Sequence, residues 1–141
     1  MASFSPAEFN VKVVEEFRAK GGYVDGTLAD FPLILVHHIG ARSGVERVVP
    51  LVYLATSDGR WMIVASNGGS CTHPAWYYNL KFHPRVTVEL GAETFHVVAE
   101  ELDSDTRSSV WPTIVEQSPA AGEFQRAITR IIPVFVLTRQ E

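Results

Sequence analysis

Two arginines beside a tight turn are the residues of this chain whose chemistry is most specific. Arg42 and Arg47 flank Ser43-Gly44. A guanidinium is planar and always charged, and it can hold two phosphate oxygens with parallel hydrogen bonds. The alternative is an ordinary solvated hairpin tip, where arginine is common, and the motif alone does not decide between the two. The spacing therefore indicates a phosphate site and does not establish one.

A polar loop and an aromatic helix start follow this turn. Residues 66–69 read Ser-Asn-Gly-Gly, and residues 73–80 read His-Pro-Ala-Trp-Tyr-Tyr-Asn-Leu. Glycines let backbone N–H groups approach an anion or a ring edge closely. The aromatic side chains point to several faces of the helix, so one packs in the core and another can face a pocket. With the apolar segment after Arg47, these features suit a flat ring that carries a phosphate.

The remaining histidines and the cysteine predict no metal site. His37 and His38 are adjacent on an expected strand, so their side chains face opposite ways, one inward and partnered, the other outward. Cys71 and the other histidines lack the spacing of zinc ligands. Cys71 with His73 resembles a nucleophile pair only in composition, because no third orienting group is apparent. No glycine-rich strand-to-helix motif is present, which excludes a nicotinamide Rossmann site or a P-loop.

Composition predicts one soluble domain over residues 1–141. Hydrophobic residues make up 46% of the chain and charged residues 20%, an ordinary globular balance. The net charge of -4 argues against nucleic acid as a partner. No apolar run approaches the roughly 18 residues of a transmembrane span, and the N-terminus lacks the pattern of a secretory signal. A single cysteine fits a reducing compartment. We expect a cytoplasmic protein, and the sequence leaves open whether it contacts a membrane peripherally.

Hydrophobic periodicity predicts a small antiparallel barrel. An N-terminal helix within residues 1–22 begins at Ser5-Pro6 and buries Phe9, Val13, Val14 and Phe17. Strands are expected at 31–39, 47–53, 61–65, 86–90, 94–101 and 133–137, and helices at 75–82, after Asp103-Ser104 and at 122–130. Pro50 cannot donate a ladder hydrogen bond, so it must lie at an edge or a bulge. A parallel sheet is excluded because the crossover helices are missing.

Several spaced motifs, taken in order, resemble the deazaflavin-dependent nitroreductase family, which uses coenzyme F420. The motifs are Gly40-Ala41-Arg42-Ser43-Gly44, Arg47, Pro50-Leu51, Ala65-Ser66-Asn67-Gly68-Gly69, Pro74-Ala75-Trp76-Tyr77-Tyr78-Asn79-Leu80, Pro84-Arg85-Val86-Thr87-Val88 and Ile132-Pro133-Val134. The similarity extends from about residue 21 to residue 137. It implies a mainly β fold: a split antiparallel β-barrel of about six strands, like that of FMN-binding proteins, with peripheral helices.

The resemblance also implies which residues bind F420. Arg42, Ser43 and Arg47 would hold the phosphate and the acidic glutamyl tail. Asn67 would reach polar groups of the cofactor. The full implied set is Ala41, Arg42, Ser43, Arg47, Val48, Val49, Pro50, Leu51, Val52, Val64, Ala65, Ser66, Asn67, Ala75, Trp76, Tyr77, Tyr78 and Asn79.

The chain departs from the family pattern in two places. Ala41 stands where the family often has the first of two basic residues. Ala121 and Phe124 match positions where better-studied members carry tyrosines near the ring. Neither side chain can donate a proton, so the catalytic residues stay unknown, with Tyr77, Tyr78 or solvent as the candidate proton sources.

The expected function is that of an F420-dependent reductase. Reduced F420 would donate a hydride to an electron-poor small molecule such as a quinone, an enone or a nitro compound, because the cofactor carries the difficult chemistry. Two alternatives stay open: a non-catalytic deazaflavin carrier, and an FMN-dependent oxidoreductase of the same fold. The sequence does not distinguish a monomer from a homodimer.

Overall fold

The computed structural model describes residues 6–25 and 31–140. The elements are α1 (Pro6–Ala19), β1 (Leu33–Ile39), β2 (Glu46–Ala55), β3 (Trp61–Val64), the 3₁₀ turn η2 (Asn67–Gly69), α2 (Ala75–Phe82), β4 (Arg85–Leu90), β5 (Glu93–Glu101), α3 (Ser104–Gln117), α4 (Pro119–Ala127) and β6 (Val134–Arg139). The predicted cap at Ser5 lies outside the described residues. None of the described helices is long and apolar enough to cross a membrane.

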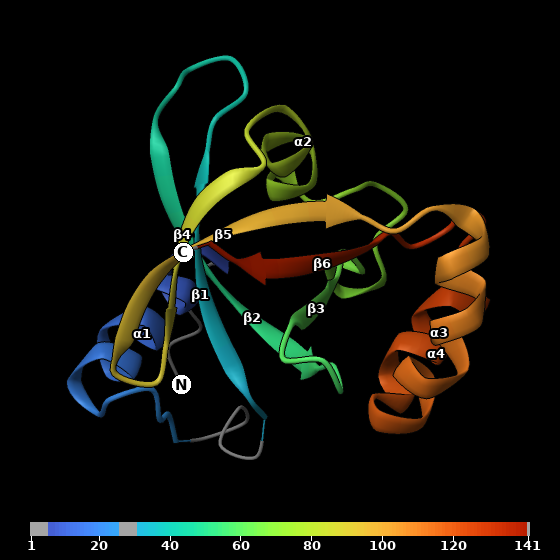
Figure 1. Ribbon diagram of the computed structural model, residues 1–141, viewed down its shortest axis with the longest axis horizontal. Helices are drawn as coiled ribbons and strands as arrows, with labels where there is room; N and C mark the ends of the chain where they lie inside the picture. The colour runs from blue at the N-terminus through green and yellow to red at the C-terminus, as the bar shows by residue number, and fades with distance from the viewer. Residues whose placement is uncertain (1–5, 26–30, 141) are drawn as a thin grey trace.

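The six strands form one closed antiparallel barrel in the order β1-β2-β3-β6-β5-β4, which confirms the predicted fold (Figure 1). Alternate residues of each strand point inward because the side-chain period of a strand is two. Ile34 and Val36 of β1, Val88 of β4 and Val97 of β5 are fully buried there. Trp76 and other apolar residues of α2 pack against this interior cluster.

One edge of β2 is left without a partner strand. β2 pairs with β1 from Glu46 to Val52, whereas it pairs with β3 only from Tyr53 to Ala55. Pro50 lies opposite Leu35 in the β1 ladder, within the part that β3 does not reach. Pro50 therefore lies at an edge, one of the two positions predicted for it, and this part of β2 has a free edge although the barrel as a whole is closed.

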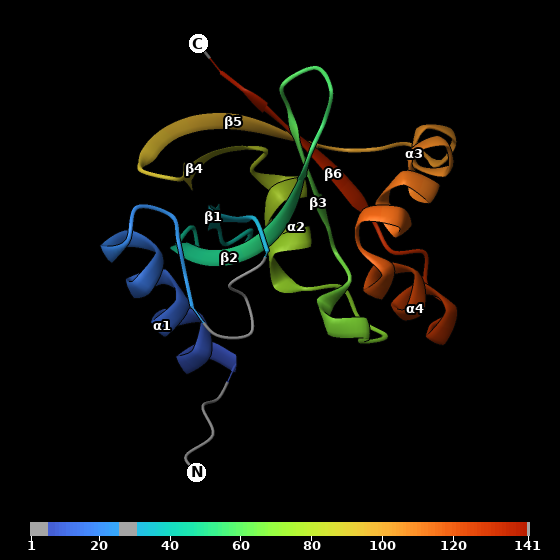
Figure 2. The ribbon, with the colours of Figure 1, turned by 90° about the horizontal axis from the view of Figure 1, so that it is seen from below.

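Helices cover two opposite sides of the barrel (Figures 1 and 2). On one side, Val13 and Phe17 of α1 pack against Leu33 and Leu35. On the other, α3 and α4 bury a third apolar cluster against β2, β3 and β6. The expected burial of Phe9 was wrong, since its side chain is 42% exposed: packing against the strands begins only at Val13.

The last helix begins earlier than expected. α4 spans Pro119–Ala127, not 122–130, because Pro119 occupies a first-turn position where its missing N–H costs nothing. Ile128 already has extended backbone angles. Residues 128–133 are therefore a connection that returns the chain to β6.

Candidate functional site

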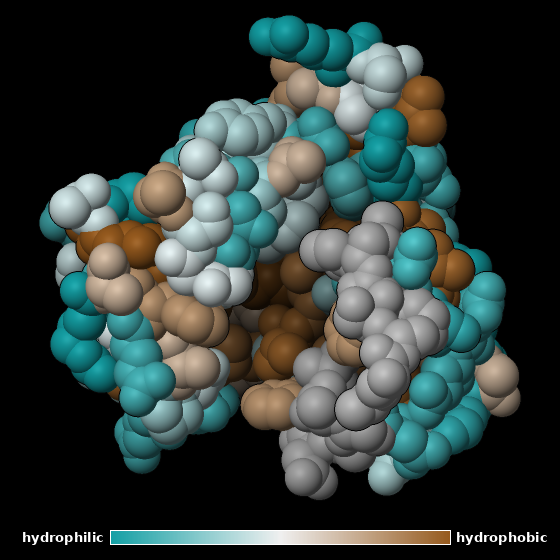
Figure 3. Space-filling model, turned by 180° about the vertical axis from the view of Figure 1, so that it is seen from behind, coloured by the Kyte–Doolittle hydropathy of each residue, from teal (hydrophilic) through white to brown (hydrophobic). Residues whose placement is uncertain are grey.

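Three adjoining cavities follow the open edge of β2. The first, about 620 Å³, lies at the β1–β2 turn and is lined by Gly40, Ala41, Arg42, Ser43, Arg47, Ala75, Tyr78 and Asn79. The second, about 590 Å³, shares Arg47 and Ala75 with it and lies between α1, β2 and α2. The third, about 420 Å³, continues from Pro50 to Phe124 of α4. A hollow with hydrophobic walls opens between the α3–α4 side and the α1 side (Figure 3).

Most of the predicted site residues line this groove. Val48, Val49 and Trp76 line the second cavity, and Pro50, Leu51, Val52, Val64 and Ser66 line the third. Ala121 and Phe124, which replace the family tyrosines, also line the third cavity. A separate cavity of about 600 Å³ between the β2–β3 hairpin and α3 contains none of the predicted residues.

The first cavity carries two uncompensated positive charges. Arg42 and Arg47 are exposed, and neither side chain forms an ion pair or a hydrogen bond with any other residue that the structure describes. By contrast, Arg18, Arg60 and Arg139 each pair with a carboxylate. Two free guanidinium groups beside a cavity are a suitable donor set for a phosphate.

Asn79 holds the basic turn against α2. Its Oδ1 accepts a hydrogen bond from the Ala41 N–H at 2.9 Å, and its amide lies 2.9 Å from Nδ1 of His38. His38 is 6% exposed, and this burial, together with the nearby charge of Arg47, lowers its pKa. A neutral His38 accepts the Asn79 N–H at Nδ1. Through these two hydrogen bonds, Asn79 fixes the position of the turn relative to α2 and β1.

The open edge of β2 offers backbone hydrogen-bonding groups to a ligand. The Tyr53 N–H donates to the Pro32 carbonyl at 3.1 Å, so odd-numbered residues of β2 direct their backbone groups toward β1. Val48 and Val52 therefore direct theirs to the open edge, and Pro50 presents only a carbonyl there. A flat ring with polar atoms on its rim fits such an edge between apolar walls.

The side chains of three predicted residues do not line the groove. The Ala65 side chain is fully buried. Asn67 has a left-handed backbone (φ 50°), and its amide donates to the Thr72 carbonyl at 3.1 Å, so it closes its own loop. Tyr77 donates its hydroxyl to Glu101 at 3.4 Å and stacks on His73 at 4.2 Å. Burial raises the pKa of Tyr77. Tyr77 is thus badly placed as a proton donor.

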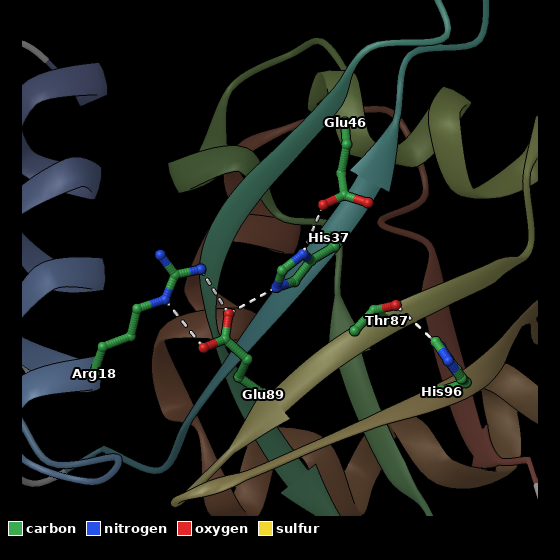
Figure 4. Close-up of polar contacts among 6 residues, drawn as sticks. All are labelled: Arg18, His37, Glu46, Thr87, Glu89 and His96. Atoms are coloured by element: carbon green, nitrogen blue, oxygen red, sulfur yellow. Dashed lines mark hydrogen bonds and ion pairs between the residues drawn. The ribbon is translucent and has the colours of Figure 1, made fainter.

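The histidine pair behaves as the strand pattern predicts. His38 points inward, where it is buried against Asn79. His37 points outward into an ion-pair network beside α1 (Figure 4). Arg18 binds Glu89 through two hydrogen bonds of 3.0 and 2.8 Å, and His37 lies 2.7 Å from Glu89 and 2.9 Å from Glu46. The Arg18 guanidinium lowers the pKa of Glu89. This network fixes α1 beside the second cavity. The described residues contain no cluster of metal-binding side chains.

Sequence reasoning missed Arg130. Its guanidinium donates to the carbonyls of Ala65, Ser66 and Ser70 at 3.2, 2.8 and 3.0 Å, and it lies 3.1 Å from Nδ1 of His73. An arginine between a helix and a strand carries no motif, so the sequence contains no signal for this role.

An antiparallel barrel with a basic turn beside an apolar groove has the features expected of a protein that binds a nucleotide-like cofactor. Comparisons with known proteins agree. The F420H(2)-dependent quinone reductase family profile matches residues 10–139. The F420H(2)-dependent quinone reductase of Mycobacterium tuberculosis H37Rv is 35% identical over 113 residues, which are 77% of this chain and 74% of that protein.

Two solved structures are also similar. An F420-H2 dependent reductase has 38% identity and a TM-score of 0.67, over 75% of this chain and 93% of that one. A chain solved as a domain-swapped dimer has 36% identity and a TM-score of 0.69, over 94% and 99%. The chain belongs to the F420H(2)-dependent quinone reductase family. The family resemblance drawn from the motifs is therefore confirmed.

Proposed function

We propose that this protein is a cytoplasmic, single-domain reductase that transfers a hydride from reduced F420 to a quinone-type acceptor. Its family membership and the F420-dependent reductases among its relatives support this function. One structural observation carries the assignment of the site. The two uncompensated guanidinium groups of Arg42 and Arg47 open directly onto the apolar groove along β2.

The residues at the two ends of the groove have different tasks. Arg42, Ser43 and Arg47 would bind the phosphate and the acidic tail of F420. Val48 and Val52 would hydrogen-bond the rim of its ring through the backbone, beside the cavity that Pro50 and Leu51 line. When bound, reduced F420 supplies the hydride. The protein binds it and orients it toward the acceptor.

The third cavity favours an acceptor that needs little help from protein acids. Its walls are mostly apolar, with Phe124 at one end and the hydroxyl groups of Ser66 and Ser118 among its few polar groups. A quinone that accepts a hydride becomes a hydroquinone anion, which takes its proton readily from water. A nitro group loses an oxygen as water and needs protons during reduction. Quinones are therefore the better substrates for this cavity.

A binding and turnover experiment tests the proposal. We expect an Arg42→Ala, Arg47→Ala variant to lose at least about 100-fold in F420 affinity by fluorescence titration, since each charge-assisted hydrogen bond contributes roughly 1.5–3 kcal/mol. The control is Arg85→Ala, Arg126→Ala, which removes two exposed arginines that line none of the cavities. Equal affinity in both variants would contradict the phosphate assignment.

The same preparation separates the alternatives. A protein that binds F420 tightly and does not reduce menadione with reduced F420 is a carrier. A protein that retains FMN and does not bind F420 is a flavin oxidoreductase of this fold. We expect tighter binding of F420 than of FMN because the arginines at the turn can also bind the glutamyl tail, which FMN lacks.

A further inference from the structure

Residues 128–133 are held rigidly although they form no helix or strand. The Gln125 amide donates to the Arg130 carbonyl at 2.7 Å, and its Oε1 accepts from the Ile132 N–H at 2.8 Å. The same Oε1 accepts from Arg107 at 2.9 Å, and Arg107 also donates to the Ile132 carbonyl at 2.7 Å. The backbone of Arg130 is therefore fixed relative to α3 and α4, which also fixes the Cα atom from which its side chain extends.

The guanidinium of Arg130 binds backbone carbonyls and not a carboxylate. It has no ion pair with any described residue, and its nitrogens reach three carbonyls, those of Ala65, Ser66 and Ser70. These carbonyls belong to the loop that connects β3 to α2. The rigid fork of an arginine can satisfy several acceptors at once, which a lysine ammonium cannot do with the same geometry. Arg130 thus sets the peptide orientation of this loop.

This orientation leaves two backbone donors available. The described residues contain no cis peptide bond, and a trans peptide directs its N–H opposite to its C=O. With the Ala65 and Ser66 carbonyls turned toward Arg130, the N–H groups of Ser66 and Asn67 point away from it. Neither N–H donates a hydrogen bond within the described part of the chain. Ser66 is right-handed and Asn67 left-handed, a pair of conformations that makes a concave surface of N–H groups able to bind an oxygen with negative charge.

The loop with these donors borders the third cavity. Ser66 lines it beside Val64 and Phe124. Phe124 packs on Gly69 so closely that a Cβ there would lie 2.7 Å from the ring. The loop is therefore held in place by the hydrogen bonds of Arg130 to its carbonyls and by the packing of Phe124 of α4 on Gly69.

We propose that Arg130 is a positioning residue that presents the Ser66 and Asn67 N–H groups to a carbonyl oxygen in the groove. The proposal rests on the proposed function. The oxygen is one that gains negative charge, either on the quinone as it accepts the hydride or on the carbonyl rim of the F420 ring. Arg130 touches neither molecule and acts through the loop.

The test compares Arg130→Met with Arg126→Met, an exposed arginine of α4 outside this network. Binding of oxidised F420 is followed by fluorescence and absorption, and turnover is measured with reduced F420 and menadione. We expect Arg126→Met to stay within about twofold of the wild type in both F420 affinity and turnover. Arg130→Met should lose about 10- to 100-fold in one of these two quantities, because misplaced hydrogen-bond donors cost factors of this size. A lower kcat with unchanged F420 affinity identifies the quinone oxygen. A weaker F420 affinity with a shifted absorption band identifies the ring carbonyl.

Two further variants keep the result decisive. Arg130→Lys keeps the charge and reaches fewer carbonyls, so a several-fold loss is expected there even if Arg130→Met does not fold. Added guanidinium ion should restore part of the turnover of Arg130→Ala. Two outcomes overturn the proposal. The first is an Arg130→Met variant that folds, melts at a lower temperature and still matches the wild type in F420 affinity and in kcat. The second applies if Arg130→Met does not fold: it is an Arg130→Lys variant with full activity. A wild type without F420 binding contradicts the proposed function, and the inference with it.

Discussion

The hydrogen bonds of Asn79 predict that one amide side chain supports both the fold and the affinity for F420. Asn79→Ala removes the acceptor of the Ala41 N–H and the donor to Nδ1 of His38. Each buried group left unpaired costs about 1–3 kcal/mol, and water can reach the half-buried Ala41 more easily than the buried His38. We therefore expect a loss of about 2–4 kcal/mol of unfolding free energy. For a chain of this size that is on the order of 10 °C in melting temperature.

F420 affinity should fall in the same variant although both arginines remain. Without Asn79, the turn that carries Arg42 must be ordered when the ligand binds, at a cost of about 1–2 kcal/mol. This corresponds to an increase of about tenfold in the dissociation constant for F420. Urea unfolding and fluorescence titration measure the two effects. Gln117→Ala, which removes an exposed helical amide outside the groove, is the control and should change neither.

Asn79→Asp separates the two hydrogen bonds. The carboxylate still accepts from Ala41, but it faces Nδ1 of His38 with an oxygen, which favours a protonated imidazole. The folded-state pKa of His38 is then raised, so the destabilisation should diminish as the pH falls from about 7.5 to 5.5. If Asn79→Ala keeps the stability and the affinity of the wild type, Asn79 does not hold the turn. If Asn79→Asp shows the same deficit at every pH, the contact with His38 contributes nothing.

Two further predictions concern His38 and the third cavity. Burial lowers the pKa of His38 from 6.5, so the folded state resists protonation: stability is full above about pH 6.5 and declines as the pH falls below it. Urea unfolding at a series of pH values should show this decline, and His38→Gln should reduce it. Phe124→Tyr adds a hydroxyl to a ring that lines the third cavity and should raise menadione turnover severalfold at unchanged F420 affinity. Steady-state rates at saturating reduced F420 measure it, and an indifferent rate would show that the proton comes from elsewhere.

The barrel could be predicted because its strands depend on local patterns. Alternating apolar residues, the Asp58-Gly59 and Gly91-Ala92 turns and the position of Pro50 all act within a few residues of one another. The start of α4 was misjudged for a local reason as well. Pro119 can occupy the first turn of a helix, whereas the expected helix began at residue 122.

The lining of the groove could be predicted most directly within a continuous stretch of the chain. β2 places Arg47, Val48, Val49, Pro50 and Leu51 along one edge, so consecutive residues in the sequence stay together in the groove. Side chains whose orientation depends on distant partners could not be predicted. Tyr77 of α2 turns away from the groove because its hydroxyl donates to Glu101 of β5 and its ring packs against Phe135 of β6.

The role of Arg130 could not be predicted from the sequence for the same reason. Its partners are backbone carbonyls some 60 residues earlier in the chain: the bond to the Ser70 carbonyl spans 60 residues and the bond to the Ala65 carbonyl spans 65. A backbone acceptor leaves no trace in residue types. Only the fold, which brings the connection after α4 behind the loop after β3, brings them together.

The unpaired edge of β2 follows from Pro50 and from the short pairing of β2 with β3. A continuous β2–β3 ladder would need an N–H at residue 50, which proline lacks. The ladder is instead confined to Tyr53–Ala55, and the backbone groups of Val48 and Val52 stay at an edge. An uncovered edge invites pairing with another chain. Here α1 and α2 flank it, with a cavity of about 590 Å³ between them and β2. The interruption of the sheet at Pro50 thus keeps an edge of β2 free beside the groove.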